Sequence, residues 1–260
     1  MTEQLNGFPD PRRDAAHDRV RRVLAFGAHP DDLDFGAAGT IAAWTAAGSE
    51  VHYAIMTDGD AGGFEPAHRE EIVAMRHEEQ RSAAARVGVR DLHFLGYPDG
   101  YLEPSHDVRR DVVRLIRMVR PDVVLAMHPE RNWSSLQMSH PDHLACGEAV
   151  TLAIYPAAEN PYAYPELEEA GLGAYRVPWL WLYGCPDERV NHVVDVTPHV
   201  DAKLEAIRVH LSQHPDIVAT ERYVRARLQA TAAGAGLPEG AFAEAFHVVA
   251  VNAKETIAGF

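Results

Sequence analysis

The chain lacks the features that mark several large classes of protein. Only two of its 260 residues are cysteines, Cys146 and Cys185, and they have no C-x-x-C spacing. A disulfide scaffold is therefore excluded, and both thiols fit a reducing compartment. No apolar run approaches the roughly 18 residues of a membrane-spanning helix. Basic residues are also scarce, with 24 Lys and Arg against 38 Asp and Glu and a formal charge of −14. This balance disfavours nucleic acid or an anionic membrane as a partner.

The expected domain organisation is simple. There is no internal repeat and no low-complexity linker, and the first residues are polar and include acids, unlike a signal peptide. Apolar residues make up 47% of the chain, enough to bury a sizeable core. We therefore expect an N-terminal extension over residues 1–20 and a single domain over residues 21–260, in a cytoplasmic protein.

Strand-like and helix-like segments alternate along the first half of the chain. Strands are predicted at 23–28, 51–57, 91–96 and 123–128, and the first and last of these are continuously apolar, as in strands buried on both faces. Helices are predicted at 35–48, at 67–88 and after a capping Ser105 or Asp107. This alternation predicts a Rossmann-like α/β fold, a doubly wound, mostly parallel sheet with helices on both faces. In the common strand order 3-2-1-4, the first and fourth strands are neighbours.

Beyond Pro156 the pattern changes. Residues 157–175 are rich in Pro, Tyr and Glu without periodicity, which predicts a long loop or lid. Two short strands are expected at 179–184 and 191–196, then a helix that starts after Thr197 and presents Leu204, Ile207 and Leu211 on one face. A last apolar stretch near the C-terminus, F-H-V-V-A-V, would add one more strand.

Two His-Pro-Asp segments follow the first and fourth predicted strands. They read A-H-P-D-D at 28–32 and S-H-P-D-H at 139–143. Because open α/β sheets bind ligands beyond the carboxyl ends of their strands, the two segments would face one crevice. Together they offer two imidazoles and a carboxylate, the ligand set of a hydrolytic zinc centre. The plainer interpretation is polar N-cap and turn residues, but two His-rich segments in matching places favour a metal site. A third His-Pro-Asp at 214–216 is interpreted as a helix end and surface turn.

These segments resemble those of the PIG-L/LmbE-like deacetylases, which include the N-acetylglucosaminyl deacetylases of mycothiol and bacillithiol synthesis. The resemblance runs from Val23 to about Pro156. Besides the two motifs it is carried by F-G-A-A-G-T, T-D-G-D-A-G-G, M-R-H-E-E-Q and Y-P-D-G, and a weaker similarity continues to L-S-Q-H and A-E-A-F. The family's first motif usually continues A-H-P-D-D-x-E, whereas this chain has Asp34 in place of that Glu. The change concerns a supporting contact rather than a metal ligand, since we expect Asp34 to support the first loop by hydrogen bonding.

The resemblance implies a role for each polar residue of the two motifs. His29, Asp32 and His143 match the metal ligands of the family. Asp31 matches the general base, which takes a proton from the water at the metal. His140 matches the residue that stabilises the oxyanion, and it could also protonate the leaving amine.

Two further residues are predicted to bind substrate. Arg76, on the long helix, matches an arginine that grips sugar hydroxyls, a task suited to a planar fork of donors. Asp99, in Y-P-D-G, matches a substrate-binding aspartate, although the sequence alone would make it a turn residue. The other histidines are assigned no role.

The predicted function is therefore hydrolysis of the acetamide of an N-acetylated amino sugar, such as an N-acetylglucosaminyl conjugate, to acetate and a free amine. The cofactor would be Zn²⁺, with Fe²⁺ able to occupy the same site. The partner would be this small-molecule substrate, with no nucleic acid and no membrane, and homo-oligomerisation is left open.

Three alternatives remain at this point. An amidase that cleaves a larger acyl group would need a wider acyl pocket beside the same ligands. A nucleotide-binding module without hydrolytic activity would need a G-x-G-x-x-G turn, whereas this turn reads G-A-H-P-D-D. A non-haem iron oxygenase uses the same two-His-one-carboxylate set, but those sites typically sit on a β-barrel rather than on alternating strands and helices.

Overall fold

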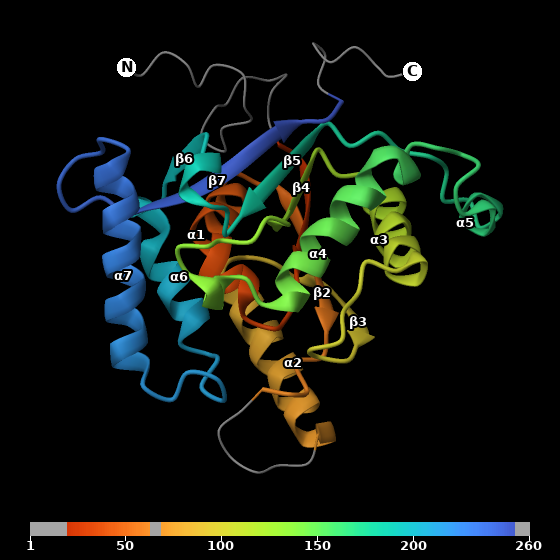
Figure 1. The fold of residues 1–260 in the computed structure, drawn as a ribbon. Helices are drawn as coiled ribbons and strands as arrows, with labels where there is room; N and C mark the ends of the chain where they lie inside the picture. Colours follow the sequence, from red (N-terminus) through yellow and green to blue (C-terminus); the bar gives the residue numbers. More distant parts are fainter. Residues whose placement is uncertain (1–19, 63–68, 253–260) are drawn as a thin grey trace.

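The computed structural model describes residues 20–62 and 69–252 as one α/β unit built on a central sheet (Figure 1). The N-terminal extension predicted over residues 1–20 lies outside these residues, apart from Val20. The sheet has seven strands in the order β3-β2-β1-β4-β5-β7-β6. In chain order the strands are β1 (Arg22–Gly27), β2 (Glu50–Thr57), β3 (Asp91–Tyr97), β4 (Val123–Met127), β5 (Trp179–Tyr183), β6 (His192–Asp195) and β7 (Ala243–Ala250).

The sheet is mostly parallel. Strands β3, β2, β1, β4 and β5 run in the same direction, while β7 pairs antiparallel with both β5 and β6. The predicted order 3-2-1-4 is confirmed, and it makes β1 and β4 direct neighbours. Nearly every side chain of these two strands is buried, which explains why their sequences are continuously apolar.

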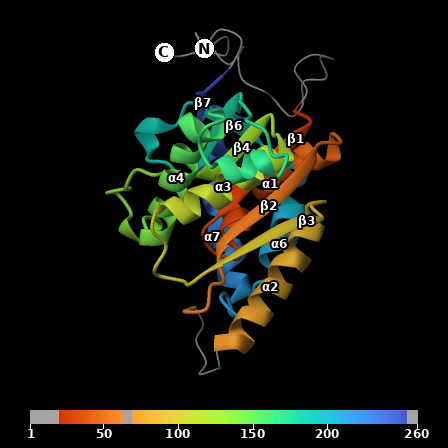
Figure 2. The same cartoon turned by 90° about the vertical axis from the view of Figure 1, so that its right-hand side faces the viewer.

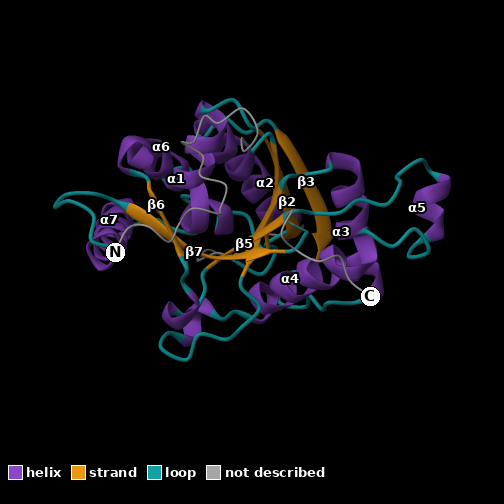
Figure 3. Cartoon of the chain, turned by 90° about the horizontal axis from the view of Figure 1, so that it is seen from above, coloured by secondary structure: helices purple, strands orange, loops and turns teal. Residues whose placement is uncertain are grey.

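Helices cover both faces of the sheet, as the alternation predicted (Figure 3). One face carries α1 (Asp32–Ala46), α2 (Arg69–Arg86) and α6 (Val200–Ile207), with α7 (Ile217–Gly234) beside α6 at the β6 edge. The other face carries α3 (His106–Val119) and α4 (Pro141–Leu152), while α5 (Pro165–Glu169) lies apart from the sheet. The shorter helical turns are Leu136–Met138, Ala153–Ala158, Asp187–Arg189 and Thr197–His199. Among the described residues, no helix is long and apolar enough to cross a membrane.

Three expectations about individual elements need correction. Helix α7 has no counterpart among the predicted elements, because its only buried residues, Val224, Leu228 and Ala232, form a stripe too thin to give a clear period. The predicted loop after Pro156 contains the short α5. Helix α6 ends at Ile207, so Leu211 lies beyond it and is exposed. Figure 2, a view from the β3 edge, shows how α2 extends below the sheet.

A glycine lets α4 approach the end of β4. A Cβ atom on Gly147 would lie 2.4 Å from the carbonyl oxygen of Met127. Because that oxygen belongs to the backbone, a side chain at this position would push the helix away from the strand. The close approach places the first turn of α4, with its histidines, beside the loop that follows β1.

A buried ion pair fastens the start of α1 to α6 and β7. The Lys203 ammonium donates hydrogen bonds to Glu244 (2.8 Å) and to the carbonyl oxygens of Asp34 (2.9 Å) and Phe35 (2.7 Å). The backbone N–H groups of Gly39 and Thr40, in turn, donate to the Glu244 carboxylate. The side chains of the pair are 0% and 2% exposed.

Replacing Lys203 by Met should lower the free energy of unfolding by about 3–5 kcal/mol, because a buried carboxylate would lose its cation. Urea denaturation followed by circular dichroism measures this change. The matched control is Arg110→Met, which removes an ion pair with Asp107 whose side chains are 40% and 74% exposed; it should cost under about 1 kcal/mol. Equal losses in the two variants would contradict the structural role given to Lys203.

Candidate metal centre

The loop between β1 and α1 is held in an unusual backbone conformation. Asp31, the N-cap of α1, has φ 105°, a region that few residues other than glycine adopt and in which Asp and Asn are enriched. Its backbone N–H donates to the Gln80 side chain of α2 at 2.7 Å. Gln80 donates in turn to Asp34 (2.8 Å), and the ring of His210 lies 2.8 Å from the same Asp34 oxygen. The supporting role predicted for Asp34 agrees with these contacts.

The second motif begins α4. His140 is the N-cap, and its Nδ1 accepts a hydrogen bond from the backbone N–H of Asp142 at 3.2 Å. Pro141 occupies the first turn, where its missing N–H costs nothing. His143 lies in the same turn, and its Nδ1 is 3.3 Å from the carbonyl oxygen of Met138. Its Nε2 therefore points away from this helix toward the first motif.

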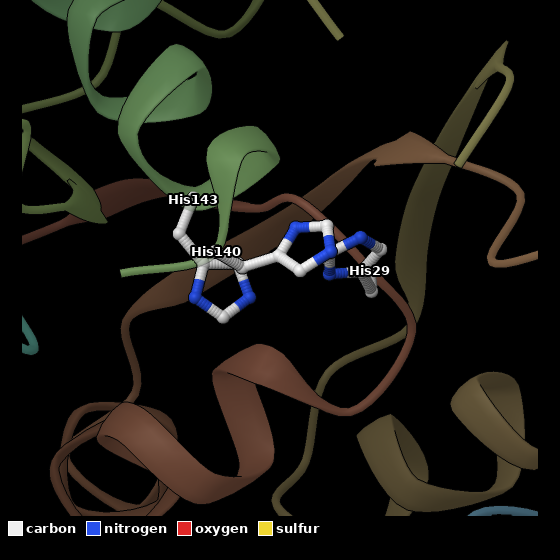
Figure 4. A group of neighbouring side chains, drawn as sticks. All are labelled: His29, His140 and His143. Carbon is white, nitrogen blue, oxygen red and sulfur yellow. The ribbon is translucent and has the colours of Figure 1, made fainter. Parts of the chain in front are cut away.

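The structure brings the three predicted metal ligands together. One oxygen of Asp32 lies 3.1 Å from Nε2 of His143. The other accepts the backbone N–H of His29 at 2.7 Å and lies 3.5 Å from its Nδ1. Figure 4 shows the His29 ring, from the loop after β1, facing the rings of His140 and His143 from α4. All three histidines contribute ring nitrogens that lie within 4.8 Å of one another.

The Nε2 atom of His29 faces two more carboxylates. It lies 3.0 Å from Asp99 and 3.2 Å from Asp142, and His29, Asp99 and Asp142 form a second cluster of possible metal ligands. A carboxylate behind a histidine ligand fixes the ring orientation and raises its basicity. Burial disfavours the charged imidazole, but contacts with three carboxylates outweigh it and raise the pKa of His29 to about 12.

This arrangement fits a divalent cation. His29 and His143 offer imidazole nitrogens and Asp32 offers a carboxylate between them, a donor set that suits zinc and related metals. Burial raises the pKa of Asp32, but the charges of His143 and His29 and their hydrogen bonds together outweigh burial and hold the pKa well below its usual value. The raised His29 pKa and the lowered Asp32 pKa share a cause, the pairing of imidazoles with carboxylates at this point.

Asp31 sits beside the metal ligands with different partners. Its Oδ2 lies 3.4 Å from the Arg76 guanidinium and 3.4 Å from Nε2 of His214. His214 belongs to the third His-Pro-Asp segment, and its ring also packs against Phe35 with the centroids 4.7 Å apart. The interpretation of this segment as a surface turn missed the contact, because residues 31 and 214 are brought together only by the packing of α1 against the segment after α6.

The two predicted substrate-binding residues are both buried. Arg76 is 3% exposed, and its guanidinium donates to the carbonyl oxygens of Gly59 (3.0 Å) and Pro30 (2.6 Å). It therefore braces the loops after β1 and β2. Asp99 is 7% exposed and contacts His29 directly. These contacts give both side chains a structural task next to the metal ligands, and their role toward substrate stays a prediction.

Asp142 is a site residue to which sequence reasoning gave no role. It is fully buried and accepts hydrogen bonds from the backbone N–H groups of Gly100 (2.7 Å) and Leu102 (3.2 Å), while contacting His29. It thus joins the loop after β3 to both motifs. Its position between the two histidines of H-P-D-H could have identified it as a residue of the site.

A mostly parallel sheet that brings two histidines and a carboxylate together beyond β1 and β4 is the arrangement expected of a metal-dependent hydrolase of the α/β class. The PIG-L family, described as GlcNAc-PI de-N-acetylase, matches residues 24–154. The chain is also 34% identical to the diacetylchitobiose deacetylase of Thermococcus kodakarensis, over 76% of this chain and 72% of that one. The chain therefore belongs to the PIG-L family of deacetylases.

Two further relatives agree with this assignment. A probable N-acetyl-alpha-D-glucosaminyl L-malate deacetylase 2 of Bacillus anthracis is 32% identical, over 74% of this chain and 81% of its own length. A solved structure of N,N'-diacetylchitobiose deacetylase from Pyrococcus horikoshii, in complex with its inhibitor MPG, superposes with a TM-score of 0.81 at 30% identity, covering 91% of this chain and 88% of that one. The chain is thus an amide hydrolase, and the nucleotide-binding and oxygenase alternatives are set aside.

Proposed function

We propose that this protein removes the acetyl group from an N-acetylglucosaminyl conjugate and that Zn²⁺ is its cofactor, with Fe²⁺ an alternative in the same site. The observation that carries the proposal is the convergence of His29, Asp32 and His143 beside an Asp31 carboxylate that has other partners. A bound metal would polarise the amide carbonyl and lower the pKa of water. We further propose a cytoplasmic protein of one domain over residues 21–260, with no nucleic-acid or membrane partner.

Asp31 is the proposed general base. The hydrogen bond from its N–H to Gln80 fixes the backbone, and contacts with Arg76 and His214 fix the carboxylate. A carboxylate held in this way can take a proton from water that attacks the acetamide. Although Asp31 and Asp32 are adjacent in the sequence, their side chains have different partners: Asp31 contacts Arg76 and His214, and Asp32 contacts the two histidines. The proposed base is thus separate from the proposed ligand.

His140 is the proposed donor to the oxyanion. Since its Nδ1 accepts the Asp142 N–H, the neutral ring carries its proton on Nε2, where it can donate to the oxygen that becomes negative. Burial, followed by the charges of His29 and His143, lowers the pKa of His140. The ring is thereby kept neutral near pH 7 and acts as a hydrogen-bond donor.

The test is a measurement of free amine released from a panel of N-acetylglucosaminyl compounds linked to inositol, malate, peptide or a second sugar. Chelation of the purified protein should abolish release, because the ligands alone do not activate water, and addition of Zn²⁺ or Fe²⁺ should restore it. Comparing the two ions at equal occupancy identifies the better cofactor. Undiminished release after the metal has been removed would refute the proposal.

A further inference from the structure

A cavity of about 320 Å³ opens next to two of the metal ligands. Asp32 and His143 line one end of it, and the rest lies between the loop after β5, strand β7 and helix α7. Apolar side chains supply much of its wall, including Phe35, Met127, Met138, Tyr183 and Leu228. The cavity is therefore continuous with the metal centre, and most of its surface is apolar.

The charged groups of this cavity are paired or balanced. Lys203 and Glu244 bind each other at 2.8 Å and are almost fully buried. Of the remaining charged groups, Asp187 and Arg227 are exposed and of opposite sign, and Asp32 lies at the end next to the metal centre. The Arg227 guanidinium lies 3.6 Å from the Met138 sulfur and faces the ring of Tyr223. Apart from the end formed by Asp32, the lining thus offers no net charge, which suits an uncharged ligand.

If Arg76 and Asp99 bind the amino sugar, as predicted, the position of the cavity decides which half of the amide would enter it. Arg76 contacts the loops after β1 and β2, and Asp99 follows β3, whereas the cavity is lined by residues of β7 and α7. Strands β2 and β3 lie toward one edge of the sheet, and β7 and α7 lie toward the other (Figure 1). The metal ligands, after β1 and β4, lie between them. An amide whose carbonyl sits at the ligands and whose amino sugar extends toward Arg76 would therefore direct its acyl carbon chain into the cavity.

The size of the cavity exceeds what an acetyl group needs. A methyl group is close in size to a water molecule, which takes about 30 Å³ in the liquid. We propose that this cavity is an acyl-binding chamber and that the enzyme also hydrolyses amino-sugar amides with straight, uncharged acyl chains of roughly four to eight carbons, a length that would fill much of its volume. This inference rests on the proposed function and extends it to a substrate class.

The experiment uses one amino-sugar conjugate, the best N-acetyl substrate of the panel, prepared with N-acetyl, N-butanoyl, N-hexanoyl and N-octanoyl groups. Free amine is measured for each with the metal-loaded enzyme. We expect kcat/KM for the hexanoyl compound to equal or exceed that for the acetyl compound, since each buried methylene adds favourable contact. Hydrolysis of the acetyl compound alone would overturn the inference and leave the proposed function standing. Hydrolysis of none of them would refute the proposed function as well.

Substitutions in β7 test whether the preference for longer acyl chains depends on the cavity. Ala245 is half-buried and lines the cavity, so Ala245→Phe would fill part of it. This change should lower kcat/KM for the hexanoyl compound about tenfold or more, the usual size of such pocket effects, while the acetyl compound changes little. The matched control, Ala250→Phe, places the same ring at an exposed position of the same strand and should leave the chain-length preference unchanged.

A second substitution, in α7, distinguishes filling of the cavity from misfolding. Thr231→Phe approaches the same space from α7, and its thermal unfolding midpoint reports whether the fold is kept. It should shift the preference toward acetyl in the same direction as Ala245→Phe. An unaltered preference for hexanoyl in a folded Thr231→Phe protein would show that the acyl chain lies elsewhere.

Discussion

Replacing Asp31 by Ala should reduce the rate of amine release by roughly a hundredfold or more, the usual cost of removing a general base. Metal content and overall fold should be retained, because Asp32, rather than Asp31, contacts both histidine ligands. The measurement is kcat for the best acetylated substrate together with metal analysis of the same sample. Activity near wild type with unchanged metal would assign the base to another residue.

Asp31→Asn is the sharper form of this test. The positive φ of Asp31 is tolerated by Asn far better than by Ala, so the amide keeps the loop in place while it removes the base. The two variants should lose similar activity. A large loss in Asp31→Ala alone would mean that backbone geometry, and not proton transfer, is the contribution of this residue.

Replacing His143 by Ala should remove the metal and, with it, essentially all activity. The ring is one of the three proposed ligands and lies 3.1 Å from another, Asp32, and two remaining ligands would hold a divalent ion far more weakly than three. Metal analysis by mass spectrometry after gel filtration gives the occupancy per chain. Stoichiometric metal in this variant would show that the assigned ligand set is wrong.

Two control substitutions, at His140 and His214, test which side chains bind the metal. His140 lies close enough to share a metal with His29 and His143, yet we expect His140→Ala to keep its metal, because Asp32 supplies the third ligand atom. His214→Ala should also keep its metal, since that ring contacts the base. Loss of metal from His140→Ala would replace the two-His-one-carboxylate centre by a three-histidine one.

The sequence predicted the fold well wherever one element buries a wide apolar surface. Strands β1 and β4 are apolar throughout because both of their faces are covered, and α3 shows a clear helical period with its Ser105 cap. Helix α7 escaped prediction because it lies at the sheet edge and buries only a narrow stripe. A helical period in the sequence is clear only where the helix buries a wide apolar face, so a helix that buries a narrow stripe is hard to predict.

The meeting of the three proposed ligands was predictable from the sequence, but the contacts that support them were not. His29, Asp32 and His143 could be paired because their motifs follow adjacent parallel strands. The approach of His214 to Asp31 depends on how the segment after α6 crosses α1, and no local pattern encodes that crossing. The burial of Arg76 was unpredictable for the same reason, since a charge-rich helix normally turns its arginines to solvent.

The placement of the two motifs makes the candidate metal site depend on the assembled sheet. His29 and Asp142 touch although they are 113 positions apart in the sequence, so the candidate ligands come together only in a chain whose strands β1 and β4 are paired. A metal ion that binds only this assembled site would stabilise the folded chain by mass action, by an amount that grows with the logarithm of the free metal concentration. The stability of the fold would then depend on the supply of metal.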